Sequence, residues 1–191
     1  DQLVLTGAID EVGAPIRENS GDSYRLGVEL TANIAINDQW LWQPNLTLSQ
    51  NKNLAYKFQR DGQIQNLGDT SIAYSPNVIG ASRVLYSPSS VFNIGLLSKF
   101  VGEQYMGNID SNLSQLPSYF INDINAVYAF GATSWAENIE VSLLINNVFD
   151  TAFISNGYFY TYDDSWSVPN QVTTIEGVGF YPQAGRNFLL G

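Results

Sequence analysis

Residues 24–37, YRLGVELTANIAIN, alternate apolar and polar side chains over the whole segment. Because successive side chains of a β-strand point to opposite faces, this segment predicts a strand with one apolar and one polar face. The alternation runs well beyond the roughly 5–6 residues of an ordinary soluble strand. It suits a tilted strand that crosses a bilayer, which needs about 9–11 residues. The feature therefore predicts an all-β chain with strands long enough to span a membrane.

Other segments repeat this period-two pattern and bring the expected number of strands to about eight. They are residues 40–50, 92–100, 120–130 and 139–146, the weaker segments 3–9 and 78–87, and a closing segment from about residue 181. Pro44 lies inside one of them and cannot donate a ladder hydrogen bond, so we expect a bulge or a late strand start there.

The connections between these segments alternate in length. Residues 37–39, 87–89 and 131–138 are short and turn-like, whereas residues 10–22, 52–76, 106–117 and 155–180 are longer and polar. Short turns on one side and long loops on the other are typical of an antiparallel up-and-down transmembrane β-barrel. Aromatic residues near the expected strand ends would then form interfacial girdles. They are Trp40, Trp42, Tyr86, Tyr105, Tyr119 and Phe130.

Composition excludes several classes of function. Charged residues make up 14% of the chain, against about a quarter in soluble domains, which agrees with a surface that does not all face water. The net charge of −10 argues against nucleic-acid binding. With no cysteine and no histidine, thiolate metal sites and histidine-dependent catalysis are excluded. We expect no enzyme activity, no cofactor and no metal site.

Two stretches carry a resemblance to a known family. Residues 143–153, LLINNVFDTAF, and residues 181–191, YPQAGRNFLLG, resemble the last two barrel strands of TonB-dependent outer-membrane receptors. The residues that match the family's pattern, all interpreted as structural, are Asn147, Phe149 and Asp150 in the first stretch and Gly185, Arg186 and Phe188 in the second. Residues 118–130 and 22–30 also look like strands of that family.

The resemblance implies a function and a setting. Family barrels have about 22 strands around a plug domain, so residues 1–191 would be the C-terminal segment of such a barrel, incomplete at both ends and without the plug. The whole receptor would import a large scarce nutrient, such as a ferric chelate, a cobalamin or an oligosaccharide. Its partners would be outer-membrane lipid, the plug, the remaining strands, the substrate and, through the plug, the TonB system. Long loops would be extracellular and short turns periplasmic.

Two alternatives use other readings of the same strands. A small closed barrel of about eight strands would have a structural or adhesive role. A soluble β-sandwich with one wet face would be a carbohydrate-binding domain.

Residues 157–166, GYFYTYDDSW, hold the densest group of aromatic and acidic side chains. As an outer loop they could stack on a sugar or an aryl-iron chelate. The candidate ligand contacts are Tyr158, Tyr160, Tyr162, Asp163, Asp164 and Trp166. The alternative is that the first half belongs to the outer girdle and the second half is a solvated loop.

The charged residues on expected polar faces have no assigned partner. Inside a barrel they would form ion pairs across the lumen or contact the plug. They are Arg25, Lys99, Glu103, Asp123 and Glu140. For Arg186 two placements stay open: paired with a carboxylate on the inward face, or on the lipid side near the outer rim.

Overall fold

The computed structural model describes residues 3–9, 15–19, 21–132, 134 and 136–191, with side chains from residue 21 onwards. Strands account for almost all regular structure, and every strand pair is antiparallel. The exception is one 3₁₀ turn, η1 (Asn112–Ser114). Within the described residues no helix has the length and apolar character needed to cross a membrane. The prediction of an all-β antiparallel chain is confirmed.

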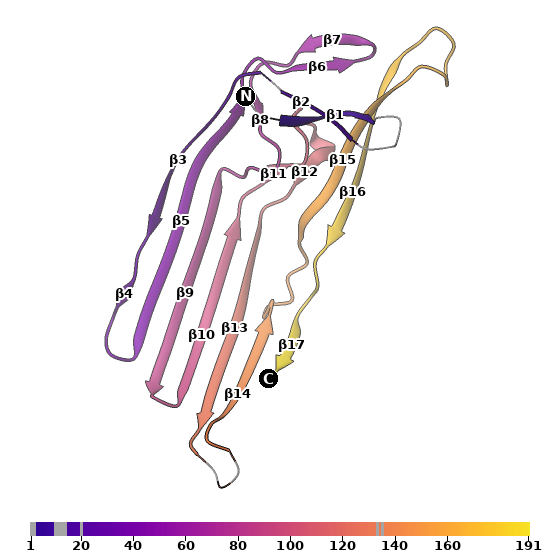
Figure 1. Ribbon diagram of the computed structural model, residues 1–191. Coiled ribbons are helices and arrows are strands. Elements are labelled where there is room, and N and C mark those ends of the chain that lie inside the picture. Colours follow the sequence, from indigo (N-terminus) through magenta and orange to yellow (C-terminus); the bar gives the residue numbers. More distant parts are fainter. Residues whose placement is uncertain (1–2, 10–14, 20, 133, 135) are drawn as a thin grey trace.

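One large twisted sheet forms the body of the molecule (Figure 1). Its strands follow the order β17-β14-β13-β10-β9-β5-β3. Their bounds are β3 (Ser23–Thr31), β5 (Trp40–Asn53), β9 (Val78–Ser89), β10 (Phe92–Val101), β13 (Tyr119–Phe130), β14 (Ile139–Asn146) and β17 (Asn187–Leu190). The short strands β4 (Ile34–Ala35) and β8 (Thr70–Ser71) pair with β5 beside this path. Within the described residues β3 and β17, the two ends of the path, do not pair with each other, so the sheet stays open.

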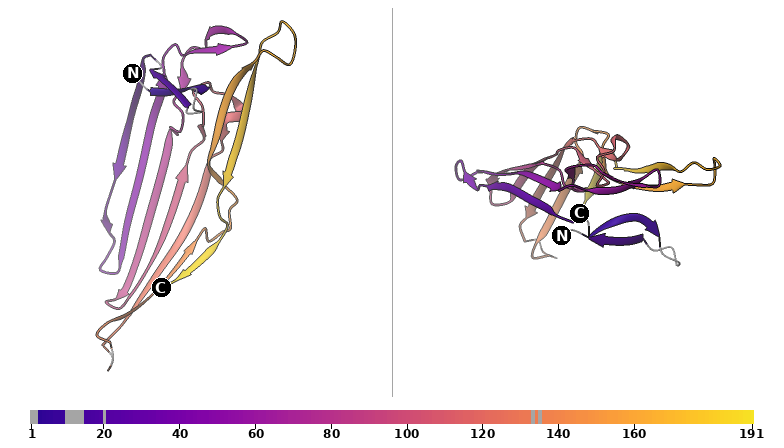
Figure 2. Two further views of the ribbon diagram at one scale, coloured as in Figure 1. Left: turned by 45° about the vertical axis from the view of Figure 1, so that its right-hand side comes forward. Right: turned by 90° about the horizontal axis from the view of Figure 1, so that it is seen from above.

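In the described part of the chain, four two-stranded ladders lie outside this sheet. They are β1 (Leu3–Ile9) with β2 (Pro15–Asn19), β6 (Lys57–Arg60) with β7 (Gln63–Asn66), β11 (Gln104–Tyr105) with β12 (Gln115–Leu116), and β15 (Ile154–Asp164) with β16 (Thr173–Pro182). All four lie toward the same end of the large sheet, which we call the loop end (Figures 1 and 2). The turns after β4 and β9 lie at the opposite, turn end, together with the end of β13 and the start of β14.

Two sequence predictions need correction here. Residues 155–180 were expected as a long polar loop, but most of them form the β15–β16 hairpin, whose register is continuous over nine residue pairs from Asn156 to Asp164. Alternation in this segment is hidden because glycines occupy positions of β16 that would otherwise show apolar side chains. Residues 3–9 do form a strand, but β1 pairs with β2 and not with the large sheet. Residues 10–14 and 20 of the first expected loop lie outside the described residues.

The large sheet has one continuous apolar face, as the alternation predicted. Cross-strand partners on it are mostly apolar, for example Leu30 with Leu46, Leu96 with Ile124, and Ile145 with Phe188. These side chains are widely exposed, with Leu26 at 70% and Phe188 at 63% of their full accessible surface. The opposite face carries most of the polar residues, including Arg25, Glu29, Asn45 and Asp123. We call these the apolar face and the polar face.

Buried apolar side chains gather at the loop end. Among the described residues they are Tyr56, Ile72, Val101, Met106 and Leu116. Each belongs to a loop, to a short ladder or to the last position of a long strand. The middle of the large sheet therefore has no packed core of its own, and its apolar face is left without a covering layer in the described part of the chain. A soluble β-sandwich would bury that face against a second sheet.

Pro44 produces no bulge in β5, contrary to expectation. The register between β5 and β9 is unbroken through the pair Pro44 and Ser82. The interruption falls on the other neighbour, where β3 ends at Thr31 and β4 begins at Ile34 with unchanged register against β5. The Pro44 carbonyl still accepts from the Ala32 N–H at 3.1 Å. Proline only removes the reciprocal donor, so the partner strand loses two residues of ladder while β5 continues.

Candidate functional site

The densest cluster of exposed aromatic side chains lies on one face of the β15–β16 hairpin. Tyr158, Tyr160 and Tyr162 alternate along β15, and Trp166 follows at its tip. Their ring centroids are 6.3, 6.4 and 5.8 Å apart in turn, with interplanar angles of 15°, 12° and 5°. The exposed fractions are 49% for Tyr158 and Tyr160, 42% for Tyr162 and 70% for Trp166. We call these four residues the tyrosine ladder.

Glycines on β16 let the rings of the tyrosine ladder lie flat against the hairpin. Gly179 is opposite Tyr158, and Gly177 is opposite Tyr160. A Cβ added at either glycine would lie 2.3 Å from Cζ of the facing tyrosine, far inside van der Waals contact. The tyrosines therefore occupy the space of the missing side chains. This pairing shields a glycine-rich strand that would otherwise expose its backbone.

Asp163 and Asp164, the two acidic residues predicted as ligand contacts, have carboxylates that accept hydrogen bonds from other parts of the protein. Asp163 accepts hydrogen bonds from Thr174 Oγ1 at 2.7 Å, and from Gln59 Nε2 and the Gly62 N–H at 3.0 Å each. The hydrogen bond from the Thr174 side chain, followed by those from Gln59 and Gly62, lowers the pKa of Asp163 despite some desolvation. Asp163 thus ties the β6–β7 hairpin to β15–β16.

Asp164 closes the tip of the β15–β16 hairpin. Its Oδ1 accepts from the backbone N–H groups of Trp166 and Ser167, each at 3.1 Å, which is an Asx turn. Hydrogen bonds from Ser167 are the largest cause of the lowered pKa of this carboxyl. The structure therefore brings the six predicted ligand contacts onto one hairpin but separates them by role. The aromatic rings are open, and the aspartates hold turns and loops.

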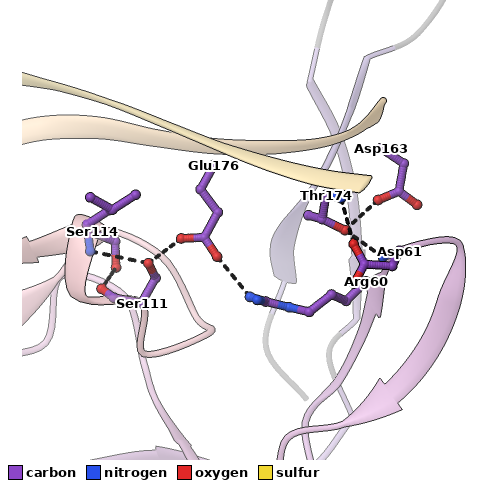
Figure 3. Close-up of polar contacts among 8 residues, drawn as sticks. Arg60, Asp61, Ser111, Ser114, Asp163, Thr174 and Glu176 are labelled. Carbon is purple, nitrogen blue, oxygen red and sulfur yellow. Dashed lines mark hydrogen bonds and ion pairs between the residues drawn. The ribbon is translucent and has the colours of Figure 1, made fainter. Parts of the chain in front are cut away.

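A polar clamp next to the tyrosine ladder was not predicted from the sequence. Arg60 Nη2 and Glu176 Oε1 form an ion pair at 2.8 Å, and the other oxygen of Glu176 accepts from Ser111 Oγ (Figure 3). Beside it, the Asp61 N–H donates to Thr174 Oγ1 at 2.6 Å, and the Thr174 N–H donates to Asp61 Oδ1 at 2.8 Å. The clamp joins the β6–β7 hairpin, the η1 loop and the β15–β16 hairpin.

The loop segment from Met106 to Ser111 lies between the large sheet and the β15–β16 hairpin. On one side, Asn53 of the polar face donates to Asn108 Oδ1 at 3.4 Å. On the other side, Gly107 contacts the ring of Phe159 so closely that an added Cβ would lie 2.6 Å from it. Phe159 therefore points to the polar side of the sheet. Since side chains alternate along β15, the tyrosine ladder points to the opposite side, the side of the apolar face.

Four of the family-motif residues meet where the turn after β14 contacts the segment between β16 and β17: Asn147, Asp150, Gly185 and Arg186. Asn147, which is 4% exposed, donates to the carbonyls of Thr151 at 2.9 Å and Ala184 at 3.4 Å and accepts from the Thr151 N–H at 2.9 Å. Asp150 Oδ1 accepts from the Arg186 N–H at 2.8 Å. Gly185 is packed so closely that an added Cβ would lie 2.6 Å from the same Asp150 oxygen. The motif therefore fastens the chain before β15 to the chain after β16.

The remaining motif residues are exposed. Phe188 lies on the apolar face opposite Ile145, and Phe149 is 71% exposed. Arg186 donates from Nη1 to the Val148 carbonyl at 3.3 Å and forms no ion pair among the described residues. Of the two placements left open for Arg186, pairing with a carboxylate is not formed among the described residues, because Asp150 is engaged by the backbone of Arg186 and not by its guanidinium group.

The polar-face charges likewise form no ion pairs with one another in the described part of the chain. Arg25 Nη1 donates to Ser75 Oγ at 2.8 Å, Glu103 accepts from Gln115 at 3.2 Å, and Asp123 accepts from the Asn147 N–H at 2.8 Å. Ser75 lies in the loop before β9, Gln115 in β12 and Asn147 in the turn after β14, and strand alternation alone does not predict these contacts.

Comparisons with known proteins give matches in structure only. No family model and no curated protein matches the chain. Among solved structures, the siderophore receptor PiuA from Acinetobacter baumannii matches over 95% of this chain, with a TM-score of 0.63 and 20% identity. The ferric-catecholate import receptor Fiu from E. coli K12 matches over 90%, with a TM-score of 0.58 and 16% identity. The ferric yersiniabactin uptake receptor FyuA from Yersinia pestis matches over 92%, with a TM-score of 0.57 and 19% identity.

The chain spans 23%, 20% and 24% of the lengths of these three receptors. At these identities the likeness establishes the fold: the chain has the fold of a section of the barrel of TonB-dependent siderophore receptors. The resemblance that the last two strands suggested is thereby confirmed at the level of fold.

Proposed function

We propose that the chain is the C-terminal part of the barrel wall of an outer-membrane receptor that imports a ferric chelate with energy from the TonB system. The observation that carries the proposal is the match of nearly the whole chain to a section of three siderophore receptors. In this proposal the plug and the other strands come from the rest of the receptor. Ferric chelates are preferred to cobalamins and oligosaccharides because each of these receptors is described as taking a siderophore or its ferric complex.

The large sheet supports a membrane location. Its apolar face is exposed and has no covering layer among the described residues, which is costly in water and favourable in lipid. Polar residues that interrupt this face have partners: Ser98 Oγ donates to Asn122 Oδ1 at 2.6 Å, and Trp42 Nε1 donates to Ser82 Oγ at 2.9 Å. Such pairing is what a polar group needs in a hydrocarbon environment.

The open sheet argues against the small closed barrel. In the described part of the chain, the edges at β3 and β17 have no partner on their outer sides. Unpaired backbone groups in lipid cost several kcal/mol each, so further strands are required to continue the wall. We orient the wall with its loop end on the extracellular side and its turn end on the periplasmic side.

The wall would hold the plug by its polar face. Arg83 donates to Gln43 at 3.4 Å, so it lies on that face without a carboxylate partner among the described residues. Lys99 lies on the same face opposite Ala81 and Ile121. These two cations are the contacts that we assign to the plug.

The test is uptake of iron-55 by cells that lack the gene encoding this chain. Wild-type and deletion cells are supplied with a set of ferric catecholates, hydroxamates and phenolates, and separately with cobalamin and maltooligosaccharides. We expect the deletion to abolish uptake of one ferric chelate, and the complemented strain to recover it. Loss of cobalamin or oligosaccharide uptake alone would overturn the substrate class. Recovery of the protein in the soluble fraction of broken cells would overturn the proposal as a whole.

A further inference from the structure

The tyrosine ladder lies on the outer side of the proposed wall. The loop that holds Met106 and Gly107 packs on the polar side of the sheet and against Phe159, so the ladder faces the opposite way. That side is continuous with the apolar face, which in the proposed function contacts lipid. The hairpin extends beyond the end of the large sheet (Figures 1 and 2). A side chain in this position faces the headgroup region of the surrounding membrane, just outside the hydrocarbon layer. It does not face the space that the wall encloses.

The chemistry of the tyrosine ladder selects among the groups found there. Neither β15 nor β16 contains a lysine or an arginine, and together they carry Asp163, Asp164 and Glu176. Among the residues whose side chains are described, the cation tied to the hairpin is Arg60, which binds Glu176 on the opposite side of the hairpin from the ladder. A surface of this charge repels phosphate groups.

Sugar rings suit the tyrosine ladder better than phosphates do. Three of its four side chains combine an aromatic ring with a hydroxyl group, and the fourth carries an indole N–H. Such side chains have an apolar body and a polar end, which fits them to a boundary where one partner is partly apolar and partly wet. A saccharide offers C–H groups to the rings and hydroxyls to the Tyr Oη atoms. The near-parallel rings provide several adjacent positions for a chain of sugar units.

We propose that the tyrosine ladder binds the saccharide chain of the glycolipid in the outer leaflet that surrounds the receptor. This inference rests on the proposed membrane location and orientation. It reassigns the predicted ligand contacts from the imported nutrient to the glycolipid. The ladder then anchors the last hairpin at the outer surface, beyond the reach of the apolar face.

The experiment compares bilayers that differ only in saccharide. The receptor expressed from its complete gene is reconstituted with lipopolysaccharide that carries its full saccharide chain, with lipid A, which keeps only the glucosamine disaccharide of its headgroup, and with phospholipid. Amide hydrogen exchange is followed in residues 154–166. We expect exchange in this segment to be about tenfold slower with the full saccharide, the factor that corresponds to about 1.4 kcal/mol of stabilisation. Equal exchange in lipopolysaccharide and lipid A would overturn the inference without any mutation.

A triple variant, Tyr158→Ser, Tyr160→Ser and Tyr162→Ser, tests the residues. We expect the saccharide-dependent protection to disappear while iron-55 uptake is retained. Ile64→Ser is the matched control because Ile64 is 76% exposed but lies on β7, away from the ladder. If the triple variant does not fold, Trp166→Ser alone is expected to reduce the protection. Protection by the ferric chelate in lipid A bilayers would assign the ladder to the nutrient and overturn the inference. The proposed function would fail by a different result, the absence of chelate uptake by wild-type receptor.

Discussion

The large sheet and the loop end are stabilised by different kinds of contact. In the sheet, each side chain meets a residue directly opposite on the next strand, and the β10–β13 register runs over ten consecutive pairs without a shift. At the loop end, the contacts join segments that are remote in sequence. Arg60 and Glu176 are 116 positions apart, and Asp61 and Thr174 are 113 apart. The sheet repeats the same cross-strand pairing between neighbouring strands, whereas the loop end depends on individual contacts between residues far apart in the sequence.

This difference has an energetic consequence. In the proposed membrane setting the strands share their stability among many backbone hydrogen bonds and lipid contacts, so we expect a single side chain of the sheet to contribute little. At the loop end, by contrast, lie the buried apolar side chains of the described residues. We therefore expect single substitutions to be most costly at the loop end and at its junction with the sheet.

The largest effect is expected at the junction, from Asn147→Ala. The substitution removes two donated and one accepted hydrogen bond at a side chain that is 4% exposed. It also places alanine at a φ of 51°, which favours asparagine and glycine. We expect a loss of about 2–4 kcal/mol in the free energy of unfolding. Urea unfolding of the reconstituted receptor measures it.

The control for Asn147→Ala is Gln65→Ala, at an exposed side chain of β7. We expect the control to change the free energy of unfolding by less than about 0.5 kcal/mol. An equally small change in the free energy of unfolding for Asn147→Ala would show that a substitution at the junction costs no more stability than one at an exposed site.

The next largest effect is expected within the hairpin, from Gly177→Ala. The new Cβ would lie 2.3 Å from Cζ of Tyr160, so the ring must leave its place. We expect a destabilisation of about 1–3 kcal/mol. In a Tyr160→Ser background the clash is absent, and the same substitution should be neutral or stabilising because alanine restricts the unfolded chain. A double-mutant cycle measures the coupling.

Gly131→Ala is the control for Gly177→Ala, since nothing lies within 4 Å of its position for a Cβ. An equal cost for the two substitutions, or no coupling between Gly177 and Tyr160, would contradict the packing of the rings on glycine.

The same contrast explains what the sequence could predict. Alternation in residues 24–37, 92–100 and 120–130 predicted strands and their two faces, because each face repeats every second residue. The resemblance in residues 143–153 predicted a barrel strand there, and β14 ends within that stretch, at Asn146. The β15–β16 hairpin was missed because glycines at 177 and 179 replace the apolar side chains that would have completed the alternation.

The clamp could not have been found from the sequence at all. Arg60 lies in RDG, a common turn sequence, and Glu176 is an isolated carboxylate between Ile175 and Gly177. Their pairing depends on how two hairpins from distant parts of the chain fold over the sheet. Likewise, the sequence singled out Asp163, but its partners Thr174, Gln59 and Gly62 lie on other segments.

A smaller effect is expected from Glu176→Gln in the clamp. The variant keeps an acceptor for Ser111 but loses the charge that binds Arg60. Because the Arg60 side chain is 37% exposed, solvent screening limits the loss to about 0.5–1 kcal/mol. Amide exchange in β6 and β7 should be about two- to fivefold faster, the factor that corresponds to this loss. Exchange in β10 and β13 should not change.

Glu103→Gln is the control for the clamp, because Glu103 is held only by a side-chain hydrogen bond from Gln115 at 3.2 Å among the described contacts. Faster exchange in β10 and β13 of Glu176→Gln would show that the clamp stabilises the whole wall and would remove the distinction between the two regions.

The smallest effect is a dependence on pH that is confined to the loop end. The hydrogen bond from Thr174, then those from Gln59 and Gly62, holds the pKa of Asp163 below its ordinary value of 3.8. A carboxyl with a lowered pKa stabilises the fold above its unfolded value, and the contribution is lost as pH falls through the lowered value. We therefore expect the attachment of the β6–β7 hairpin to be constant above pH 3.8 and to weaken on further acidification.

Asp163→Asn should remove this dependence on pH. Asp164→Asn should leave it in place, since Asp164 holds only the tip of its own hairpin. Amide exchange of residues 57–66 between pH 5 and pH 2.5, corrected for intrinsic rates, separates the two variants. If acid loosened the large sheet before these residues, the titration would belong to the wall, and the loop end would not be the part that depends on individual pairs.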